Sequence, residues 1–92
     1  MNIFDVIAEP NRRRILSLLR ERERSAGELV TRLGLAQPSV SKHLKVLREA
    51  KLVTVRGDAA RRLYSLRPEP LAALEAWLQP YRRYYEAQRV AA

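Results

Sequence analysis

Cysteine is absent from this sequence of 92 residues, and histidine, tryptophan and phenylalanine occur once each. A chain without cysteine forms no disulfide bond, no thiolate metal site and no thiol redox sensor. No apolar run approaches the roughly 18 residues of a membrane span. The N-terminal stretch MNIFDVIAEP lacks the basic start and long apolar segment of a signal peptide. We therefore expect a cytoplasmic protein that does not bind a membrane.

Acidic residues are scarce in the middle of the chain. Residues 32–67 hold nine Lys and Arg but only two acidic residues, Glu49 and Asp58, which is a net charge of +7 within a chain whose total is +8. A positive charge concentrated in one region indicates a polyanionic partner. The alternative, a basic surface kept for solubility, usually spreads its charge more evenly.

The same scarcity argues against an enzyme. A small basic nuclease needs paired carboxylates for a metal ion, or a histidine within an acid–base pair. The basic region offers only Glu49, Asp58 and His43. One histidine without cysteine also cannot assemble a tight transition-metal site. We predict no catalytic residue, no metal site and no cofactor.

Apolar residues recur at helical spacing through most of the chain, and the length suits one domain with a modest core. We predict a mainly α-helical fold with a small β-hairpin. The expected helices cover roughly 3–7, 10–22, 26–33, 37–50 and 69–89. The expected hairpin pairs 52–56 with 61–66 around a turn at 57–60 and has a basic tip.

Several residues mark the expected helix ends. Ser25 and Glu28 form the S-x-x-E pattern of a capping box, and Gly34 is placed to end the helix that follows. Arg12, Arg13 and Arg14 fall near the start of their helix, where the helix dipole disfavours positive charge. We therefore expect these arginines on a solvated face or at a phosphate, and not as stabilising groups.

The last helix carries an apolar seam in steps of three and four residues, which is the spacing of a coiled-coil contact. The seam consists of Leu71, Leu74, Leu78, Tyr81 and Tyr85, widened by Trp77 and Tyr84. A domain this small has little interior left to cover it, so we predict a dimer surface that also includes Ile3, Phe4 and Ile7. A helix folded back on its own core is the second choice. Pro80 should kink the helix without ending it.

Two helices, a short link, a third helix and a basic hairpin follow the order of a winged helix-turn-helix. With the segments AEPNRRRILSLL, SAGELVTRLGLAQPSVSKHLKVLREAKLV, RRLYSL and PEPLAALEAWLQPYR, the chain resembles the ArsR-type family of bacterial transcription regulators. The resemblance covers most of the chain. It implies a homodimer that binds an inverted-repeat operator in double-stranded DNA, usually as a repressor. Helix 37–50 would be the recognition helix, 26–33 its supporting helix and 52–66 the wing.

Two departures from the family pattern stand out. Ala36 replaces the Ser or Thr that many members carry just before the recognition helix, a hydroxyl cap worth roughly 1 kcal/mol, and Ser39 is a partial substitute. Many members also sense metals through cysteines near 27–33 or through Asp and His on the last helix. Here 71–89 contains only Glu75 and Glu86 as candidates. We expect no release by metal or thiol oxidation.

The polar face of helix 37–50 suits the major groove, where a helix reads base edges with its N-terminal half. The predicted DNA contacts are Gln37, Ser39, Ser41, Lys42, His43 and Lys45 from this helix, and Arg56, Arg61 and Arg62 from the wing. Ser41 has an intrahelical hydrogen bond as its alternative, His43 a packing role and Lys45 plain solvation. Arg61 and Arg62 alternate along a strand, so one of them can point away from DNA.

Three questions stay open at this level. Trp77, Tyr81, Tyr84 and Tyr85 suit a ligand pocket at the dimer interface as well as a plain interface core. The identity of any small-molecule inducer is unknown. The alternative to a DNA-binding regulator is a winged helix that binds another protein, which would need no basic recognition face.

Overall fold

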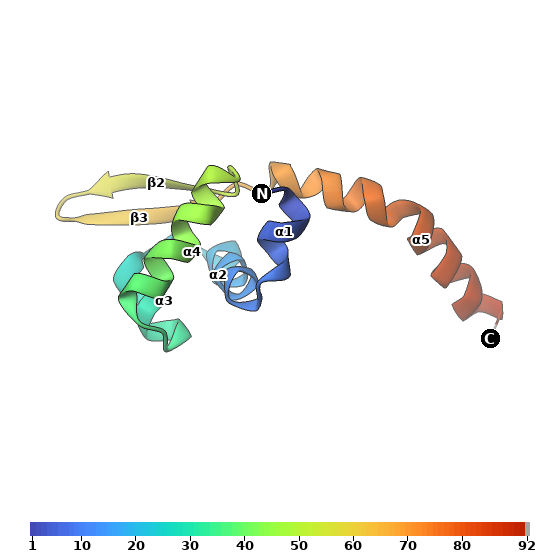
Figure 1. Ribbon diagram of the computed structural model, residues 1–92, viewed down its shortest axis with the longest axis horizontal. Helices are drawn as coiled ribbons and strands as arrows, with labels where there is room; N and C mark the ends of the chain where they lie inside the picture. The colour runs from blue at the N-terminus through green and yellow to red at the C-terminus, as the bar shows by residue number, and fades with distance from the viewer. Residues whose placement is uncertain (92) are drawn as a thin grey trace.

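The protein is described by a computed structural model that covers residues 1–91 (Figure 1). Its elements are α1 (Ile3–Ala8), α2 (Pro10–Glu21), β1 (Arg24–Ser25), α3 (Ala26–Leu33), α4 (Gln37–Glu49), β2 (Val53–Asp58), β3 (Arg61–Leu66), the 3-10 turn η1 (Glu69–Leu71) and α5 (Ala72–Ala91). The strands form one antiparallel sheet in the order β1-β3-β2. The prediction of a mainly helical chain with a small hairpin is confirmed, with one strand more than expected.

The core lies where α1, α2, α3, α4 and the start of β2 meet. Its buried side chains are Val6, Ile15, Leu19, Leu29, Leu33, Val40, Leu44, Leu47, Leu52 and Val53. The predicted stripe of α4 (Val40, Leu44 and Leu47) is fully inside, at no more than 2% exposed. Burial of this stripe fixes which face of α4 is left for solvent.

The strand β1 was not predicted, and it ties the helices to the hairpin. Arg24 pairs with Tyr64 and Ser25 with Leu63 in the neighbouring strand β3. The Arg24 side chain is only 2% exposed. Its guanidinium donates to the Leu18 carbonyl oxygen at 3.0 Å and forms ion pairs with Glu21 and Glu28. A two-residue strand has no periodic pattern, so the sequence gave no signal for it.

The turn of the hairpin is shorter than predicted. The register runs from Val53 opposite Leu66 to Asp58 opposite Arg61, which leaves only Ala59 and Ala60 in the turn. Gly57 and Asp58 therefore belong to β2 and not to the turn. Ala59 takes a φ of +54°, as the first residue of a tight two-residue hairpin turn must. The glycine suggested a turn that began at Gly57, but Gly57 and Asp58 pair with Arg62 and Arg61 as strand residues. The strand pairing therefore places the turn two residues later.

The predicted caps of α3 are confirmed in part. The Ser25 side chain accepts a hydrogen bond from the Glu28 backbone at 3.1 Å, and Gly34 ends the helix in the left-handed region at φ +68°. The Glu28 carboxylate does not complete the capping box and instead binds Arg22 and Arg24. At the start of α4, Ala36 provides no side-chain cap.

Arg13 and Arg14 are exposed, as predicted, and Arg12 is half-buried. The sequence did not predict that all three also bind backbone carbonyl groups near the ends of other helices. Arg12 donates to the Val6 oxygen at 2.6 Å and Arg13 to the Ile7 oxygen at 2.7 Å, in the last turn of α1. Arg14 donates to the Leu33 oxygen at 3.1 Å, at the end of α3. These carbonyl groups have no partner within their own helix, so the arginines stabilise neighbouring helices rather than their own.

Helix α5 leaves the body of the molecule and extends away from it (Figure 1). The chain has a radius of gyration of 15.9 Å, whereas a compact domain of this length has roughly 12 Å. Helix α5 is therefore not folded back on its own core. The helix continues through Pro80, as predicted, and its axis bends along its length in Figure 1.

The buried arginine of β1 gives a first testable prediction. Arg24→Met should lower the free energy of unfolding by about 3 kcal/mol, because it leaves Glu28 and the Leu18 carbonyl without a buried partner. Chemical denaturation measures this difference. The control is Arg20→Met, at an exposed arginine in the last turn of α2, which should change the free energy of unfolding by less than about 0.5 kcal/mol. Equal losses for the two variants would contradict the structural role of Arg24.

Candidate nucleic-acid interface

The exposed face of α4 is polar and basic. Gln37, Ser41, Lys42 and Lys45 are exposed, together with Arg48, which was not among the predicted DNA contacts. Successive helical residues turn by about 100°. Lys42 and Lys45 therefore lie nearly opposite the buried stripe, while Gln37, Ser41 and Arg48 lie along one flank. These residues form a continuous surface that a polyanion can approach.

Two of the predicted contacts lie on the other flank of α4. Ser39 is half-buried, and the His43 side chain is 16% exposed. The His43 Nε2 atom lies 3.8 Å from a carboxylate oxygen of Glu9. Glu9 also accepts a hydrogen bond from the Arg12 backbone and so caps α2. This position favours the packing role for His43 over the predicted base or phosphate contact.

Arg56 of the wing is held by an acidic residue from the corner between α2 and β1. Its guanidinium donates to the Glu23 carboxylate at 2.7 and 3.3 Å. Ser65 of β3 donates its hydroxyl to the same carboxylate at 3.1 Å. The hydrogen bond from Arg56 is the main reason why the pKa of Glu23 lies below its usual value. Glu23 thus binds both strands of the hairpin.

The two arginines after the turn differ in their surroundings. Arg61 pairs with Asp58 at 3.6 Å across the turn and shares its strand face with Arg56. Arg62 stands opposite Gly57 on the other face, and it forms no ion pair with the part of the chain that the structure describes. Arg62 is therefore the wing arginine with the least competition for a phosphate.

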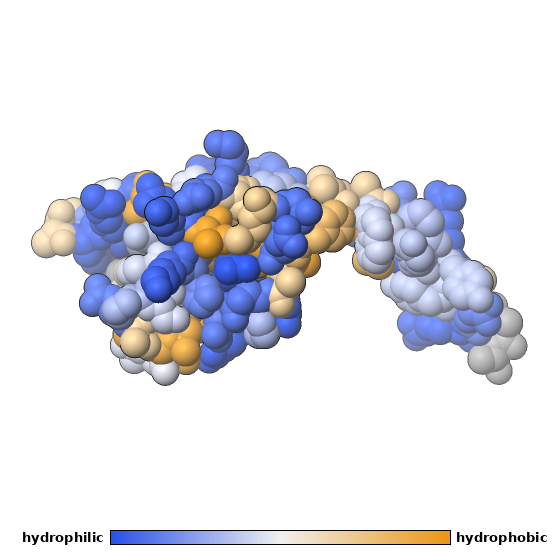
Figure 2. All heavy atoms as spheres, viewed as in Figure 1, coloured by the Kyte–Doolittle hydropathy of each residue, from blue (hydrophilic) through white to orange (hydrophobic). Residues whose placement is uncertain are grey.

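The seam of α5 is open to solvent on an isolated chain. Trp77, Tyr81, Tyr84 and Tyr85 are between 44% and 68% exposed. Phe4 of α1 contacts Trp77 edge to face with ring centroids 5.9 Å apart, and Trp77 packs against Tyr81. Leu71 and Ile3 instead pack partly on the core. On the face shown in Figure 2, hydrophobic residues gather where α5 leaves the body, and hydrophilic ones cover much of the rest.

The described residues contain neither a membrane-spanning helix nor a cluster of metal ligands. None of the helices is long and apolar enough to cross a membrane. No three His, Asp or Glu side chains within that part of the chain stand close enough together to hold a metal ion.

Helices α2, α3 and α4 with a basic β2–β3 hairpin make a winged helix-turn-helix, a class of DNA-binding proteins. The chain belongs to the ArsR family of bacterial regulatory proteins, whose family model matches residues 9–55. The protein is thus a DNA-binding transcriptional regulator, and the predicted family is confirmed.

Relatives with known names support this assignment. The HTH-type transcriptional regulator Rv2034 of Mycobacterium tuberculosis is 40% identical over 85% of this chain and 73% of its own length. The transcriptional repressor SdpR of Bacillus subtilis is 31% identical over 84% of this chain and 86% of its own. The transcriptional activator HlyU of Vibrio cholerae is 34% identical over 95% and 79%. A solved structure of HlyU from Vibrio cholerae superposes with a TM-score of 0.70 at 36% identity, covering 86% of this chain and 87% of that one.

The contact between Glu23 and Arg56 gives a second testable prediction. Glu23→Gln should release Arg56 toward phosphate and tighten binding to duplex DNA several-fold. The plot of log K against log salt should also become steeper, by about 0.9 for each added phosphate contact. A double-mutant cycle with Arg56→Ala isolates the effect. If Glu23→Gln tightens binding equally in the Arg56→Ala background, the gain comes from net charge alone and Glu23 does not restrain Arg56.

Proposed function

We propose that the protein is a homodimeric, sequence-specific repressor that binds an inverted-repeat operator. Helix α4 enters the major groove of each half-site, and the β2–β3 wing lies on the adjacent backbone or minor groove. The observation that carries the proposal is the exposed basic face of α4 directly opposite its buried stripe. A winged helix that binds only proteins has no need of such a face.

The chemistry of that face suits base reading at one end and phosphate contact at the other. Gln37 and Ser41 lie toward the N-terminal half, where a recognition helix meets base edges. The Gln37 amide can pair with adenine through two hydrogen bonds, and Lys42 can donate to guanine. Lys45 lies further along and suits a phosphate. In the wing, Arg62 is the first candidate for a backbone or minor-groove contact. Arg61 is paired with Asp58, and Arg56 with Glu23.

A second copy of the chain is the partner proposed for the α5 seam. Leu78 and the aromatic side chains from Trp77 to Tyr85 are exposed along one helix that has no core beneath it. Two such seams in heptad spacing bury each other in a coiled-coil contact. The cluster of Trp77, Tyr81, Tyr84 and Tyr85 then serves as interface core. Repression is proposed from the family and from SdpR, while the named activity of HlyU makes activation the second candidate.

Selection of bound fragments from the host's genomic DNA, at physiological salt with non-specific competitor, tests the proposed function. We expect an inverted repeat whose half-sites are about 34–36 Å apart or a multiple of one helical turn. Binding should weaken with salt at a slope of about −5 to −9 per dimer, if each subunit meets three to five phosphates. A reporter gene behind the selected site then separates repression from activation.

The matched variant for this experiment is Lys42→Ala. It should weaken binding to the selected operator by about 1–3 kcal/mol and weaken binding to unrelated duplex much less. Equal losses on both duplexes would make Lys42 a phosphate contact only. Recovery of no sequence above background would contradict specific reading and favour a protein partner for the winged helix.

The dimer gives a separate prediction. Leu78→Glu should convert the protein to a monomer, because it places a charge at the centre of the seam, as measured by sedimentation equilibrium. Gln79→Glu is the matched control, since it adds the same charge at an exposed position of α5 that lies outside the seam and should leave the dimer intact. A dimer that survives Leu78→Glu would show that α5 is not the interface.

A further inference from the structure

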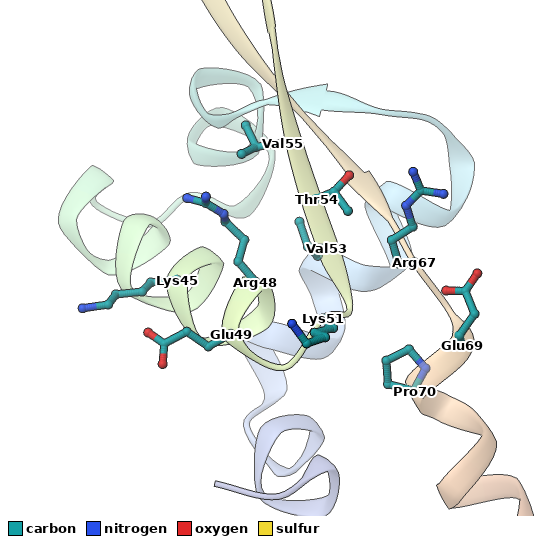
Figure 3. Close-up of a pocket in the computed structure, with 10 residues that line it drawn as sticks. All are labelled: Lys45, Arg48, Glu49, Lys51, Val53, Thr54, Val55, Arg67, Glu69 and Pro70. Carbon is teal, nitrogen blue, oxygen red and sulfur yellow. The ribbon is translucent and has the colours of Figure 1, made fainter.

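A basic groove lies between the C-terminal half of α4 and the base of the wing (Figure 3). It has a volume of about 950 Å³ and is open to solvent. Its lining residues are Lys45, Arg48, Glu49, Lys51, Val53, Thr54, Val55, Arg67, Glu69 and Pro70. They come from α4, the turn after it, strand β2 and the segment between β3 and α5. The groove shares Lys45 and Arg48 with the exposed face of α4 and extends from there to Lys51 and Arg67, which lie outside the recognition helix and the tip of the wing.

The cations of the groove are not neutralised by neighbours. Lys45, Arg48, Lys51 and Arg67 form no ion pair within 4.0 Å in the part of the chain that the structure describes. Arginines elsewhere behave differently, since Arg24 and Arg56 are engaged by carboxylates. Glu49 and Glu69 line the same groove, so four cations against two acids leave it with a net positive charge. An anion is the ligand that this charge favours.

The position of the groove relative to the exposed basic face of α4 indicates which anion it binds. Arg48 shares its flank of α4 with Gln37 and lies about 16 Å further along the helix axis, at roughly 1.5 Å per residue. The major groove is about 12 Å wide. When the N-terminal half of α4 reads base edges, the C-terminal end therefore reaches the edge of the groove. The sugar–phosphate backbone of one strand lies there.

Lys51 follows the C-cap of α4 and lines the groove. It takes a φ of +63°, in the left-handed region that a residue with a side chain adopts only at a cost in free energy. Glycine is the residue that this conformation favours. The end of α4 accounts for this conformation: the Lys51 backbone N–H donates to the Arg48 oxygen and the Leu52 N–H to the Leu47 oxygen, both at 3.0 Å, which is the pattern of a Schellman motif. A lysine in place of glycine at this position puts an exposed cation among the residues that line the groove.

We propose that this groove binds the phosphodiester backbone of the DNA strand at the edge of the major groove. Arg48, Lys51 and Arg67 contact its phosphates. Val55 and Pro70 provide apolar surface against its sugars. The inference rests on the proposed major-groove placement of α4 and adds a third contact region between the recognition helix and the wing tip. Since it concerns the backbone, it acts on every DNA sequence alike.

The test measures dissociation constants for a duplex of random sequence over a range of sodium chloride concentrations. Arg48→Gln and Lys51→Gly should each weaken binding roughly tenfold near 0.15 M salt. Each should also reduce the magnitude of the salt slope by about 2, which is 0.9 per phosphate in each of two subunits. Lys51→Gly should leave the melting temperature unchanged or higher, because it relieves the left-handed backbone, so its loss of binding cannot come from unfolding.

Arg20→Gln is the charge-matched control, at an exposed arginine of α2 outside the groove. It should keep the slope of the parent protein. If Arg48→Gln and Lys51→Gly also keep that slope while Arg62→Gln in the wing reduces it, the groove does not touch DNA and the proposed function still stands. If the parent protein shows no salt-dependent binding to any duplex, both proposals fall.

Discussion

The buried guanidinium of Arg24 is the interaction on which the arrangement of the binding elements depends. It binds the Leu18 carbonyl in α2, Glu21 at the end of α2 and Glu28 in α3, while its backbone extends the sheet through Tyr64. Burial opposes the charge on Glu28, yet hydrogen bonds from Arg24 and Arg22 outweigh it and hold the pKa of Glu28 below its usual value. Arg24 therefore connects the helix-turn-helix to the wing, and its contacts hold the two in a fixed orientation.

The arginines fall into two groups, those that stabilise the fold through internal contacts and those that remain exposed on the surface. Arg12, Arg13 and Arg14 satisfy carbonyl groups near helix ends, and Arg24 is enclosed. The charged groups of these residues therefore bind partners within the chain. The cations from Lys42 to Arg67 mostly face solvent. The positive charge available to DNA therefore lies on this part of the surface. The total of +8 alone would not distinguish the two groups.

The sequence predicted the helices, their buried stripes and the hairpin because each leaves a periodic pattern within a few residues. It failed where partners are distant in the chain. Glu23 and Arg56 are 33 residues apart, and nothing local indicates that they meet. His43 shows the same limit, since its neighbour Glu9 belongs to another helix. On α4 the exposed positions Gln37, Ser41, Lys42 and Lys45 followed from the helical wheel. The same wheel places Arg48 beside Gln37, so Arg48 could have been predicted with them.

Helix α1 links the two ends of the molecule. Its Val6 is buried in the core beside α4, and its Phe4 contacts Trp77 on α5. The carbonyls at its end are held by Arg12 and Arg13. If two chains pair through α5, this short rigid helix sets the distance from the dimer axis to each recognition helix. Reading two half-sites on one face of DNA requires that distance to be fixed. The contacts from Arg12 and Arg13 to the end of this six-residue helix would help to keep that distance fixed.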